Sequence, residues 1–334
     1  MVSAVIFVAT SCVSPLTGFA FWETNLAYEG ESIYNYLQVK NLSDRTILST
    51  NVLFGVQSVT MKDKRLTGMY YDTALAAPAL ADNANSALIL GMGTGTYARQ
   101  LKQYYPKMNI TGVEIDQKIT DLAGEYFDEP ADIPVTTYDG RAWLAASHDK
   151  YDVIMVDAYQ DITIPFQMSS TEFFTMVREH LNPGGVMVVN MNMISDGQGS
   201  INEALSDTIA SVFGNGNTLT ADVPNTTNRE LFAKKPGSGS EENSMQQASK
   251  ALNLRETTYE RTGSEDLEWY MEEVASRFRK VNEPDSASTI LTDDKAPVEV
   301  LGMHAIDQII ADEAGPYRQI LKDEGFGGLL RAVQ

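Results

Sequence analysis

Three glycines that directly follow an apolar run restrict the fold of this chain more than any other feature. Ala87-Leu88-Ile89-Leu90 has the length and composition of a buried strand, and Gly91-Met92-Gly93-Thr94-Gly95 follows it without a gap. Residues 97–105 then have helical character. Glycines at such a turn let the backbone reverse sharply and let a ligand approach closely. The pattern predicts the first strand-to-helix step of an α/β fold, either with a ligand at the turn or as a tight turn without one.

The alternation of strand and helix continues to residue 189. Strands are expected at residues 110–113, 135–137, 153–156 and 186–189, and helices at residues 72–80, 118–126, 142–146 and 171–181. Asn182-Pro183-Gly184-Gly185 is expected to form a turn. Strands and helices that alternate in this way build a parallel sheet covered on both faces. The sequence therefore predicts an α/β fold with a doubly wound, mostly parallel sheet.

Two further regions flank this predicted domain, which we place at residues 71–235. Residues 31–70 are expected to form a small N-terminal antiparallel β-sheet, with strands at 33–39, 46–48 and 52–59 and a turn at 41–44. Residues 235–248 are polar and rich in glycine and serine, which is typical of an exposed loop. Residues 246–334 are expected to form a helical C-terminal extension, helical over 246–280 and anchored by Trp269 and Tyr270.

The first 22 residues carry no charged side chain and are mostly apolar. Their length could just span a bilayer, but several serines, threonines and a proline weaken them as a spanning helix, and no basic residue precedes them. Three interpretations stay open for residues 1–22: a membrane-anchor remnant, the end of a longer membrane domain, or a buried first strand.

Composition and charge exclude several classes of function. The net charge of −20 makes nucleic acid a poor partner and suits a cationic ligand such as a polyamine, although acidity also serves solubility. Cys12 is the only cysteine and the three histidines are scattered, so the sequence indicates no metal site. Thr96 stands where the dinucleotide fingerprint G-x-G-x-x-G has its last glycine, which disfavours a nicotinamide-dependent enzyme.

An acidic residue follows each of the next three strands. Glu114 ends the second strand, where a carboxylate can accept hydrogen bonds from both ribose hydroxyls, and Asp116 is expected to be solvated or to cap the next helix. Asp139 follows the third strand and could accept from an adenine amine or cap a helix, and Asp157 ends the fourth. Because the carboxyl ends of parallel strands share one edge, we expect these acids and the glycine turn to line one cleft.

An ordered set of motifs resembles the spermidine synthase (polyamine aminopropyltransferase) family. The set is Gln57, Tyr70-Tyr71-Asp72, Gly91-Met92-Gly93-Thr94-Gly95, Val113-Glu114-Ile115-Asp116, Asp139-Gly140 and Val156-Asp157. Three more stretches look like the bacterial spermidine synthase-like proteins that are often fused to membrane segments. These stretches are Glu31-Ser32-Ile33-Tyr34-Asn35-Tyr36, Ile164-Pro165 and Leu291-Thr292-Asp293-Asp294-Lys295-Ala296-Pro297-Val298-Glu299.

The resemblance implies that the doubly wound sheet is of the Rossmann-like methyltransferase type, and it implies a role for each site residue. The nucleoside-containing co-substrate would be bound by Gln57, Gly91, Gly93, Gly95, Glu114, Asp139 and Gly140. Asp157 would be the catalytic residue that receives the amine proton, and the substrate would contact Tyr70, Tyr159 and Gln160. The family usually has a second acid in Asp-Ser-Ser-Asp-Pro, whereas this chain has Asp157-Ala158-Tyr159-Gln160-Asp161. The family's later Tyr-Pro-Ser-Gly segment is replaced by Val223-Pro224-Asn225-Thr226.

The implied activity is transfer of an aminopropyl group from decarboxylated S-adenosylmethionine to an amine, which releases methylthioadenosine. S-Adenosylmethionine itself stays open as an alternative donor. Neither a metal nor a permanently bound cofactor is expected. Two alternatives stay open: another S-adenosylmethionine reaction (methyl transfer or donor self-cleavage), or a non-catalytic nucleoside sensor. The expected partners are a polyamine or other amine and a second copy of the chain. The implied location of the catalytic domain is cytoplasmic, with membrane association through residues 1–22 as an alternative.

Overall fold

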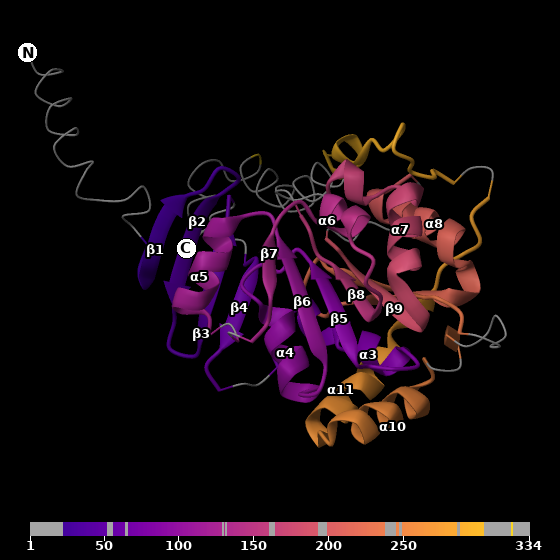
Figure 1. The fold of residues 1–334 in the computed structure, drawn as a ribbon, viewed down its shortest axis with the longest axis horizontal. Coiled ribbons are helices and arrows are strands. Elements are labelled where there is room, and N and C mark those ends of the chain that lie inside the picture. Colours follow the sequence, from indigo (N-terminus) through magenta and orange to yellow (C-terminus); the bar gives the residue numbers. More distant parts are fainter. Residues whose placement is uncertain are drawn as a thin grey trace, which may run out of the picture.

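The computed structural model describes residues 23–51, 56–63, 66–128, 130, 132–159, 164–192, 199–237, 245–246, 249–285, 288–303 and 322. Within them lie a four-stranded sheet near the N-terminus and an eight-stranded central sheet (Figure 1). The predicted fold class, a mostly parallel α/β sheet with a small antiparallel N-terminal sheet, is confirmed. Residues 1–22, on which the three interpretations of the apolar segment depend, lie outside the described residues.

The parallel part of the central sheet contains all the strands expected in this region. In spatial order these strands are β9 (Leu181–Met191), β8 (Tyr151–Val156), β5 (Ser86–Leu90), β6 (Asn109–Glu114) and β7 (Val135–Thr137). The chain runs outward from β5 through β6 and β7, then returns to β8 on the other side of β5. The strand order therefore reverses between β5 and β8, and open α/β sheets bind their ligands at such a point.

The other edge of the sheet is antiparallel and was not predicted. It consists of β11 (Arg229–Lys234), β10 (Thr218–Asp222) and β12 (Phe278–Lys280), with β11 hydrogen-bonded to β9. The turn predicted at residues 182–185 is wrong, because β9 includes these residues as an irregularity between its two pairings with β8. β12 lies in the region expected to be wholly helical, so the C-terminal part of the chain also contributes a strand to the sheet.

Helices cover both faces of the central sheet, and the side chains of each strand alternate between two apolar clusters. One face packs against α2 (Tyr70–Ala74), α3 (Ala76–Leu80), α4 (Thr96–Tyr104), α10 (Ala251–Thr262) and α11 (Glu265–Ser276), and the other against α6 (Gly140–Ala146), α7 (Thr171–His180) and α8 (Ile201–Phe213).

The helix predicted at residues 72–80 is divided into α2 and α3 because of a proline. Pro78 has no N–H with which to bond the carbonyl oxygen of Ala74. The hydroxyl of Tyr97 on α4 donates to that oxygen instead, at 3.0 Å. The break places Tyr70 and Tyr71 on a separate short helix beside the edge where β8 ends.

The N-terminal sheet is an antiparallel meander of β1 (Leu26–Glu31), β2 (Tyr36–Asn41), β3 (Arg45–Thr50) and β4 (Ser58–Met61). β1 was not expected, and the strand predicted at 33–39 begins only at Tyr36 because residues 32–35 form the connecting turn. The sheet packs on α5 (Gln117–Tyr126) through a cluster that contains Leu37, Val39 and Leu122.

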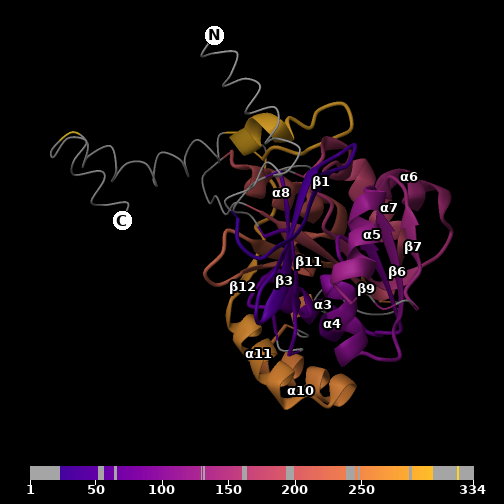
Figure 2. The same cartoon turned by 90° about the vertical axis from the view of Figure 1, so that its left-hand side faces the viewer.

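Figures 1 and 2 both place α10 and α11 at the end of the molecule away from β1. Trp269 on α11 was predicted to anchor the helical region, but it is 56% exposed and contacts the Arg255 guanidinium at 3.7 Å instead of the core. Tyr270 does pack against the core. Most of the predicted loop, at residues 238–244, lies outside the described part of the chain. Among the helices that the structure describes, none has the length and apolar character needed to cross a membrane.

Candidate functional site

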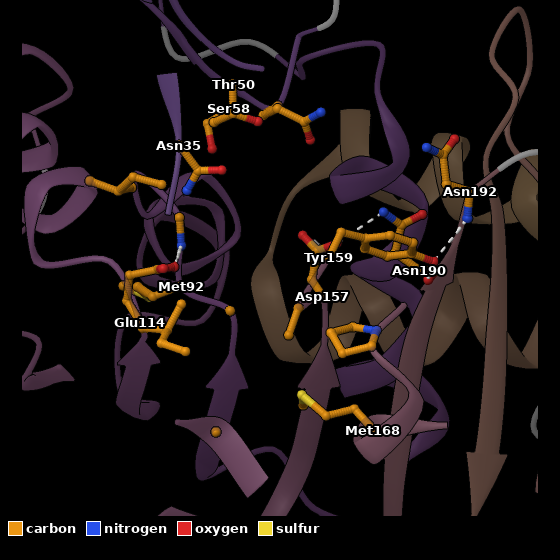
Figure 3. Close-up of a pocket in the computed structure, with 18 of the residues that line it drawn as sticks. Asn35, Thr50, Ser58, Met92, Glu114, Asp157, Tyr159, Met168, Asn190 and Asn192 are labelled. Atoms are coloured by element: carbon orange, nitrogen blue, oxygen red, sulfur yellow. Dashed lines mark hydrogen bonds between the residues drawn. The ribbon is translucent and has the colours of Figure 1, made fainter. Parts of the chain in front are cut away.

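A cavity of about 380 Å³ opens at the carboxyl ends of β5, β6 and β8, at the point where the strand order reverses. The N-terminal sheet forms its opposite wall through side chains that include Leu48, Thr50 and Ser58. Figure 3 shows Glu114 and Asp157 at the ends of two strands beside this cavity, with Tyr159, Asn190 and Asn192 gathered on the side of Asp157. The predicted meeting of the glycine turn and the three strand-end acids in one cleft is what the structure contains.

The glycine turn is held against the backbone of the neighbouring strand. Gly91 has a φ of +88°, and a Cβ atom there would lie 2.4 Å from the carbonyl oxygen of Asp157. A Cβ atom on Gly93, with a φ of +55°, would lie 2.9 Å from Ser58 Oγ. Both glycines line the cavity, whereas Gly95 stands at the N-terminus of α4 and is not among the lining residues. Close backbone packing at Gly91 therefore requires a glycine there even before any ligand is considered.

Glu114 is a buried acid tied to the glycine turn. Its Oε2 atom accepts from the Gly93 N–H at 2.8 Å, and its Oε1 atom accepts from the Asp116 N–H at 3.0 Å. Burial raises the pKa of Glu114 above its ordinary value, while these backbone hydrogen bonds act in the opposite direction. The carboxylate is thus fixed at the end of β6 with its oxygen atoms beside the cavity.

The two other acids of this region cap helices. Asp116 caps α5 through the Lys118 N–H at 3.0 Å, and its second oxygen accepts from Ser32 Oγ at 2.5 Å and Asn35 Nδ2 at 2.9 Å. It is only 2% exposed, so the expectation of a solvated side chain is wrong and that of a cap is confirmed. Asp139 lines the cavity and also caps α6 through the Ala142 N–H at 2.8 Å, so its use as a cap is confirmed and its contact with adenine stays a prediction. Gly140 lines the cavity beside it.

Asp157 lies just beyond the end of β8, between two hydrogen-bond donors. The hydroxyl of Tyr70 donates to Oδ2 at 2.7 Å, and Asn190 Nδ2 donates to Oδ1 at 2.9 Å. Burial raises the pKa of Asp157 to about 7, although both hydrogen bonds favour the ionised form. A carboxyl group with this pKa can take up and release a proton near neutral pH.

A polar lobe of the cavity adjoins Asp157 on the side of β9 and β11. We call it the asparagine lobe, and it consists of Tyr159, Asn190, Asn192, Thr227 and Asn228. The Tyr159 hydroxyl donates to the Asn190 carbonyl oxygen and accepts from the Asn192 N–H at 2.9 Å. Asn228 Nδ2 donates to Asn190 Oδ1 at 2.9 Å.

Sequence reasoning named Tyr159 but missed the asparagines. Asn190 and Asn192 stand at the carboxyl end of β9, so the rule that identified Glu114 and Asp157 could have found them. Asn228 immediately precedes β11, an antiparallel strand that was not predicted, so no such signal existed for it.

Of the remaining predicted site residues, two line the cavity and one lies outside the described residues. Tyr70 and Gln57 line the cavity, and the Gln57 carbonyl oxygen accepts from the Tyr71 hydroxyl at 2.6 Å. Gln160 and Asp161 lie outside the described residues. In the part of the chain that the structure describes, no three His, Cys, Asp or Glu side chains gather as metal ligands would.

The chain was compared with known protein families and curated proteins. Residues 69–235, half of the chain, match the family model of the spermine/spermidine synthase domain. A probable polyamine aminopropyl transferase of Bifidobacterium longum is 99% identical over all of this chain, which corresponds to 75% of that protein. A polyamine aminopropyltransferase of Vibrio vulnificus is 28% identical over 209 residues, which cover 60% of this chain and 69% of that protein.

Solved structures share the fold at lower sequence identity. A probable spermidine synthase from Corynebacterium glutamicum superimposes with a TM-score of 0.56 at 22% identity and covers 80% of this chain and 99% of its own. Spermidine synthase from Thermotoga maritima superimposes with a TM-score of 0.51 at 19% identity, over 64% of this chain and 74% of its own.

Proposed function

The chain belongs to the spermine/spermidine synthase family, and on that premise we propose that its cavity transfers an aminopropyl group from decarboxylated S-adenosylmethionine to an amine. Methylthioadenosine is the second product. The sulfonium of the donor makes the adjacent methylene carbon electrophilic. The amine nitrogen attacks this carbon with its lone pair, the carbon–sulfur bond breaks, and its electron pair neutralises the sulfur. The proton that the nitrogen must lose passes to the protein.

The observation that carries this proposal is the state of Asp157. An alkyl ammonium has a pKa near ~10, so its nucleophilic neutral form is scarce at neutral pH. A carboxyl group whose pKa is raised to about 7 is better matched to accept that proton than an ordinary aspartate. Its hydrogen bonds to Tyr70 and Asn190 fix its orientation, which supports a proton acceptor held in one place.

The nucleoside half of the donor would occupy the other side of the cavity. Glu114 would accept hydrogen bonds from the ribose hydroxyls, because its carboxylate is fixed beside the glycine turn. Burial disfavours the ionised form of Glu114, and hydrogen bonds from the ribose would offset that free-energy cost. Asp139, Gly140 and Gln57 would surround the rest of the nucleoside. The sulfonium would then lie between Glu114 and Asp157, and both reactants would be held in line, which lowers the barrier of a bimolecular step.

Tyr70 and Tyr159 would bound the path of the amine. Tyr70 is buried and Tyr159 is partly buried, and burial raises the pKa of each phenol above its ordinary value. Both phenols are therefore neutral at the pH of the reaction. Tyr70 can donate a hydrogen bond to the Asp157 carboxylate, and Tyr159 to the Asn190 carbonyl oxygen, without charge repulsion. Any contribution of Gln160 to this wall, and assembly of two copies of the chain, remain predictions.

The decisive experiment is to incubate the protein with decarboxylated S-adenosylmethionine, with and without an amine, and to quantify the nucleoside products by chromatography. We expect methylthioadenosine to appear only when an amine is present. Methylthioadenosine without an amine would mean donor self-cleavage. S-Adenosylhomocysteine formed from S-adenosylmethionine would mean methyl transfer, and no product from either donor would leave only a nucleoside sensor.

A further inference from the structure

Asp72 is a buried acid on α2 that the transfer reaction leaves without a role. The residue is 0% exposed and does not line the cavity. Its Oδ1 atom accepts from the Thr67 N–H at 3.0 Å, from the Thr67 hydroxyl at 2.8 Å and from Gln100 Nε2 at 2.5 Å. Its Oδ2 atom accepts from the Gly68 N–H at 2.6 Å. The carboxylate therefore binds both the turn that precedes α2 and, through Gln100, helix α4.

These hydrogen bonds hold the first turn of α2 in place. They close a loop from the preceding turn to Asp72, and this loop contains Tyr70 and Tyr71. Gly68 turns the chain with a φ of +74°, a conformation that favours glycine. The N-cap residue Met69 offers no side-chain hydrogen bond to the helix, and five residues are too few for a helix to be stable by itself. The first turn of α2 therefore needs contacts with its surroundings, and the carboxylate of Asp72 makes several of them.

The same turn brings two tyrosines to the cavity. The Tyr70 hydroxyl donates to Asp157 Oδ2 at 2.7 Å, and the Tyr71 hydroxyl donates to the Gln57 carbonyl oxygen at 2.6 Å. Both tyrosines line the cavity, and their ring centroids are 4.0 Å apart. A displacement of the turn would therefore move the Tyr70 hydroxyl away from Asp157.

We propose that Asp72 is a positioning residue of the transfer reaction, because it holds the first turn of α2 so that the Tyr70 hydroxyl stays on Asp157. This inference rests on the proposed function, in which Asp157 accepts the proton of the amine. Asp72 acts through Tyr70 and touches neither substrate. Gln100 extends the connection to α4, the helix that follows the glycine turn. One acid thus links that helix to the proton acceptor.

The expected effect has a sign that a direct effect of charge cannot produce. Burial raises the pKa of Asp157 to about 7, and the hydrogen bond from Tyr70 lowers it. This pKa should therefore rise when Tyr70 moves away, whereas removal of the negative charge of Asp72 would by itself lower the pKa of a nearby acid. Other titratable groups that interact electrostatically with Asp157 or Asp72 include Tyr71, Tyr104, Glu114, Tyr159, Glu230 and Tyr270. The variants below leave these groups unaltered.

The first test compares the acid limb of the kcat profile between wild type and Asp72→Asn, measured by methylthioadenosine release with an amine present. Asparagine keeps the size of the side chain, but its NH₂ group is a donor, so it cannot accept all the hydrogen bonds that the carboxylate accepts. We expect the limb to move to higher pH by about one unit, which corresponds to the loss of one hydrogen bond to Asp157. A limb that stays in place or moves to lower pH would overturn the proposal.

The matched control is Asp152→Asn. Asp152 is a buried acid on β8, the strand that leads to Asp157, and it does not line the cavity. It accepts from the Asn85 N–H at 2.8 Å and from Asn182 Nδ2 at 2.8 Å, so this variant also loses buried hydrogen bonds. Its melting temperature should fall, while its acid limb should match that of wild type. An equal movement of the limb in the control would mean a general loosening of the fold and would contradict the role of Asp72.

A double-mutant cycle tests whether Asp72 acts through Tyr70. Tyr70→Phe removes the hydroxyl and should move the limb to higher pH by itself. In the Asp72→Asn background the same substitution should add no further movement, because the hydrogen bond to Asp157 is already lost. Two movements that add would show that Asp72 acts by another route, which would refute the inference.

Thr67→Val is a milder variant for the case in which Asp72→Asn does not fold. It removes the hydroxyl that donates to Asp72 and accepts from the Met69 N–H at 3.1 Å, and it keeps the backbone hydrogen bonds to the carboxylate. We expect a smaller movement of the limb to higher pH. A folded Thr67 variant with the acid limb of wild type would overturn the proposal.

A direct measurement of the pKa of Asp157 separates this inference from the proposed function. If wild type transfers no aminopropyl group, the proposed function fails, and NMR titration of protein labelled with ¹³C at the aspartate carboxyl groups then tests Asp72 alone. The Asp157 signal is the one that disappears in Asp157→Asn. A higher pKa of Asp157 in Asp72→Asn than in wild type supports the inference, and an equal or lower pKa contradicts it.

Discussion

Burial and two hydrogen bonds act on the Asp157 carboxyl group in opposite directions. Burial opposes its ionisation, whereas Tyr70 and Asn190 donate to its two oxygen atoms and favour it. The balance leaves the pKa at about 7, far above that of an ordinary aspartate. The same residue can therefore stay ionised when the amine arrives and still hold the proton that the amine gives up.

Replacing Asp157 with asparagine tests its role as proton acceptor. Asparagine keeps the shape and much of the hydrogen bonding but has no basicity, so we expect turnover to fall about 10²–10⁴-fold. Binding of methylthioadenosine, measured by calorimetry, should change little because that product lacks the amine. Turnover near that of wild type would remove Asp157 from the chemistry, and lost methylthioadenosine binding would make it a residue of the nucleoside pocket instead.

Tyr70→Phe tests how the pKa of Asp157 is set. In the proposed reaction the ionised form of Asp157 is the active form, so we expect activity above its pKa and a loss of activity as the pH falls through about 7. The hydrogen bond from Tyr70 lowers the pKa of Asp157, so its loss should raise that pKa. The acid limb of the kcat profile should therefore move to higher pH, as measured by methylthioadenosine release from about pH 5 to 9. A limb that stays in place would mean that another group limits the rate.

Residue by residue, the sequence could identify those site residues that occupy strand ends of the parallel sheet. Glu114, Asp139 and Asp157 all follow apolar runs, and their position alone brings them to one edge. Asn228 could not be found in this way, because it immediately precedes β11, which reaches the site only through an antiparallel pairing with β9. A local pattern of residues contains no information about which distant strand becomes the neighbour.

At the scale of elements, the parallel strands were predictable because they are buried on both faces and therefore read as continuous apolar runs. β12 and β1 were not, because they lie at sheet edges where fewer side chains are buried. The C-terminal segment around Asp293 resembles the family in sequence, but the sequence predicts no structural role for it. In the structure, Asp293 is bound to the part of α6 that lies beside the cavity.

Arg141 on α6 makes this connection. It donates to both Asp293 carboxylate oxygens, at 2.7 and 2.6 Å, and to the Gln167 carbonyl oxygen at 2.7 Å. Gln167 and Gly140, which precedes Arg141, both line the cavity. We expect Asp293→Ala to raise the KM for the donor several-fold with little change in kcat, because the wall would be less rigidly placed while the reacting groups are untouched.

Steady-state kinetics with varied donor concentration checks the prediction for Asp293. The control is Asp132→Ala, which breaks an exposed ion pair with Lys102 at 2.7 Å that lies away from the cavity. The Asp132 variant should match wild type. A reduced kcat with an unchanged KM in the Asp293 variant would contradict a role in positioning the wall.

For the whole molecule, the N-terminal sheet and the central sheet share one cavity. The turn between β1 and β2 is bound to the central domain through Asp116, which accepts from Ser32 and Asn35. Asn35 also lines the cavity. The two sheets are therefore joined at the end of β6, next to the acid that we assign to the ribose.

Asn35→Ala should weaken binding of methylthioadenosine by about 1.5–3 kcal/mol, because it removes a hydrogen bond to a charged group that holds the turn over the cavity. Calorimetry with purified protein measures the change. Lys40→Ala, which breaks the ion pair between β2 and Glu23 at 2.7 Å, is the comparison variant and should bind as wild type does. Unchanged affinity in the Asn35 variant would show that the nucleoside site does not depend on this joint.

The contact between Gly91 and the Asp157 backbone limits how such an enzyme could diversify. No side chain fits between Gly91 and the backbone of Asp157. A substitution at Gly91 that reshapes the proposed donor side of the cavity would therefore also displace Asp157, the proposed proton acceptor. Directed evolution of a new donor at this position would therefore lose activity before it gained specificity. Variation in the acceptor has no such constraint, because β9 and β11 approach Asp157 from the opposite side. New amine specificities in this lineage should accumulate there, at the antiparallel edge of the sheet.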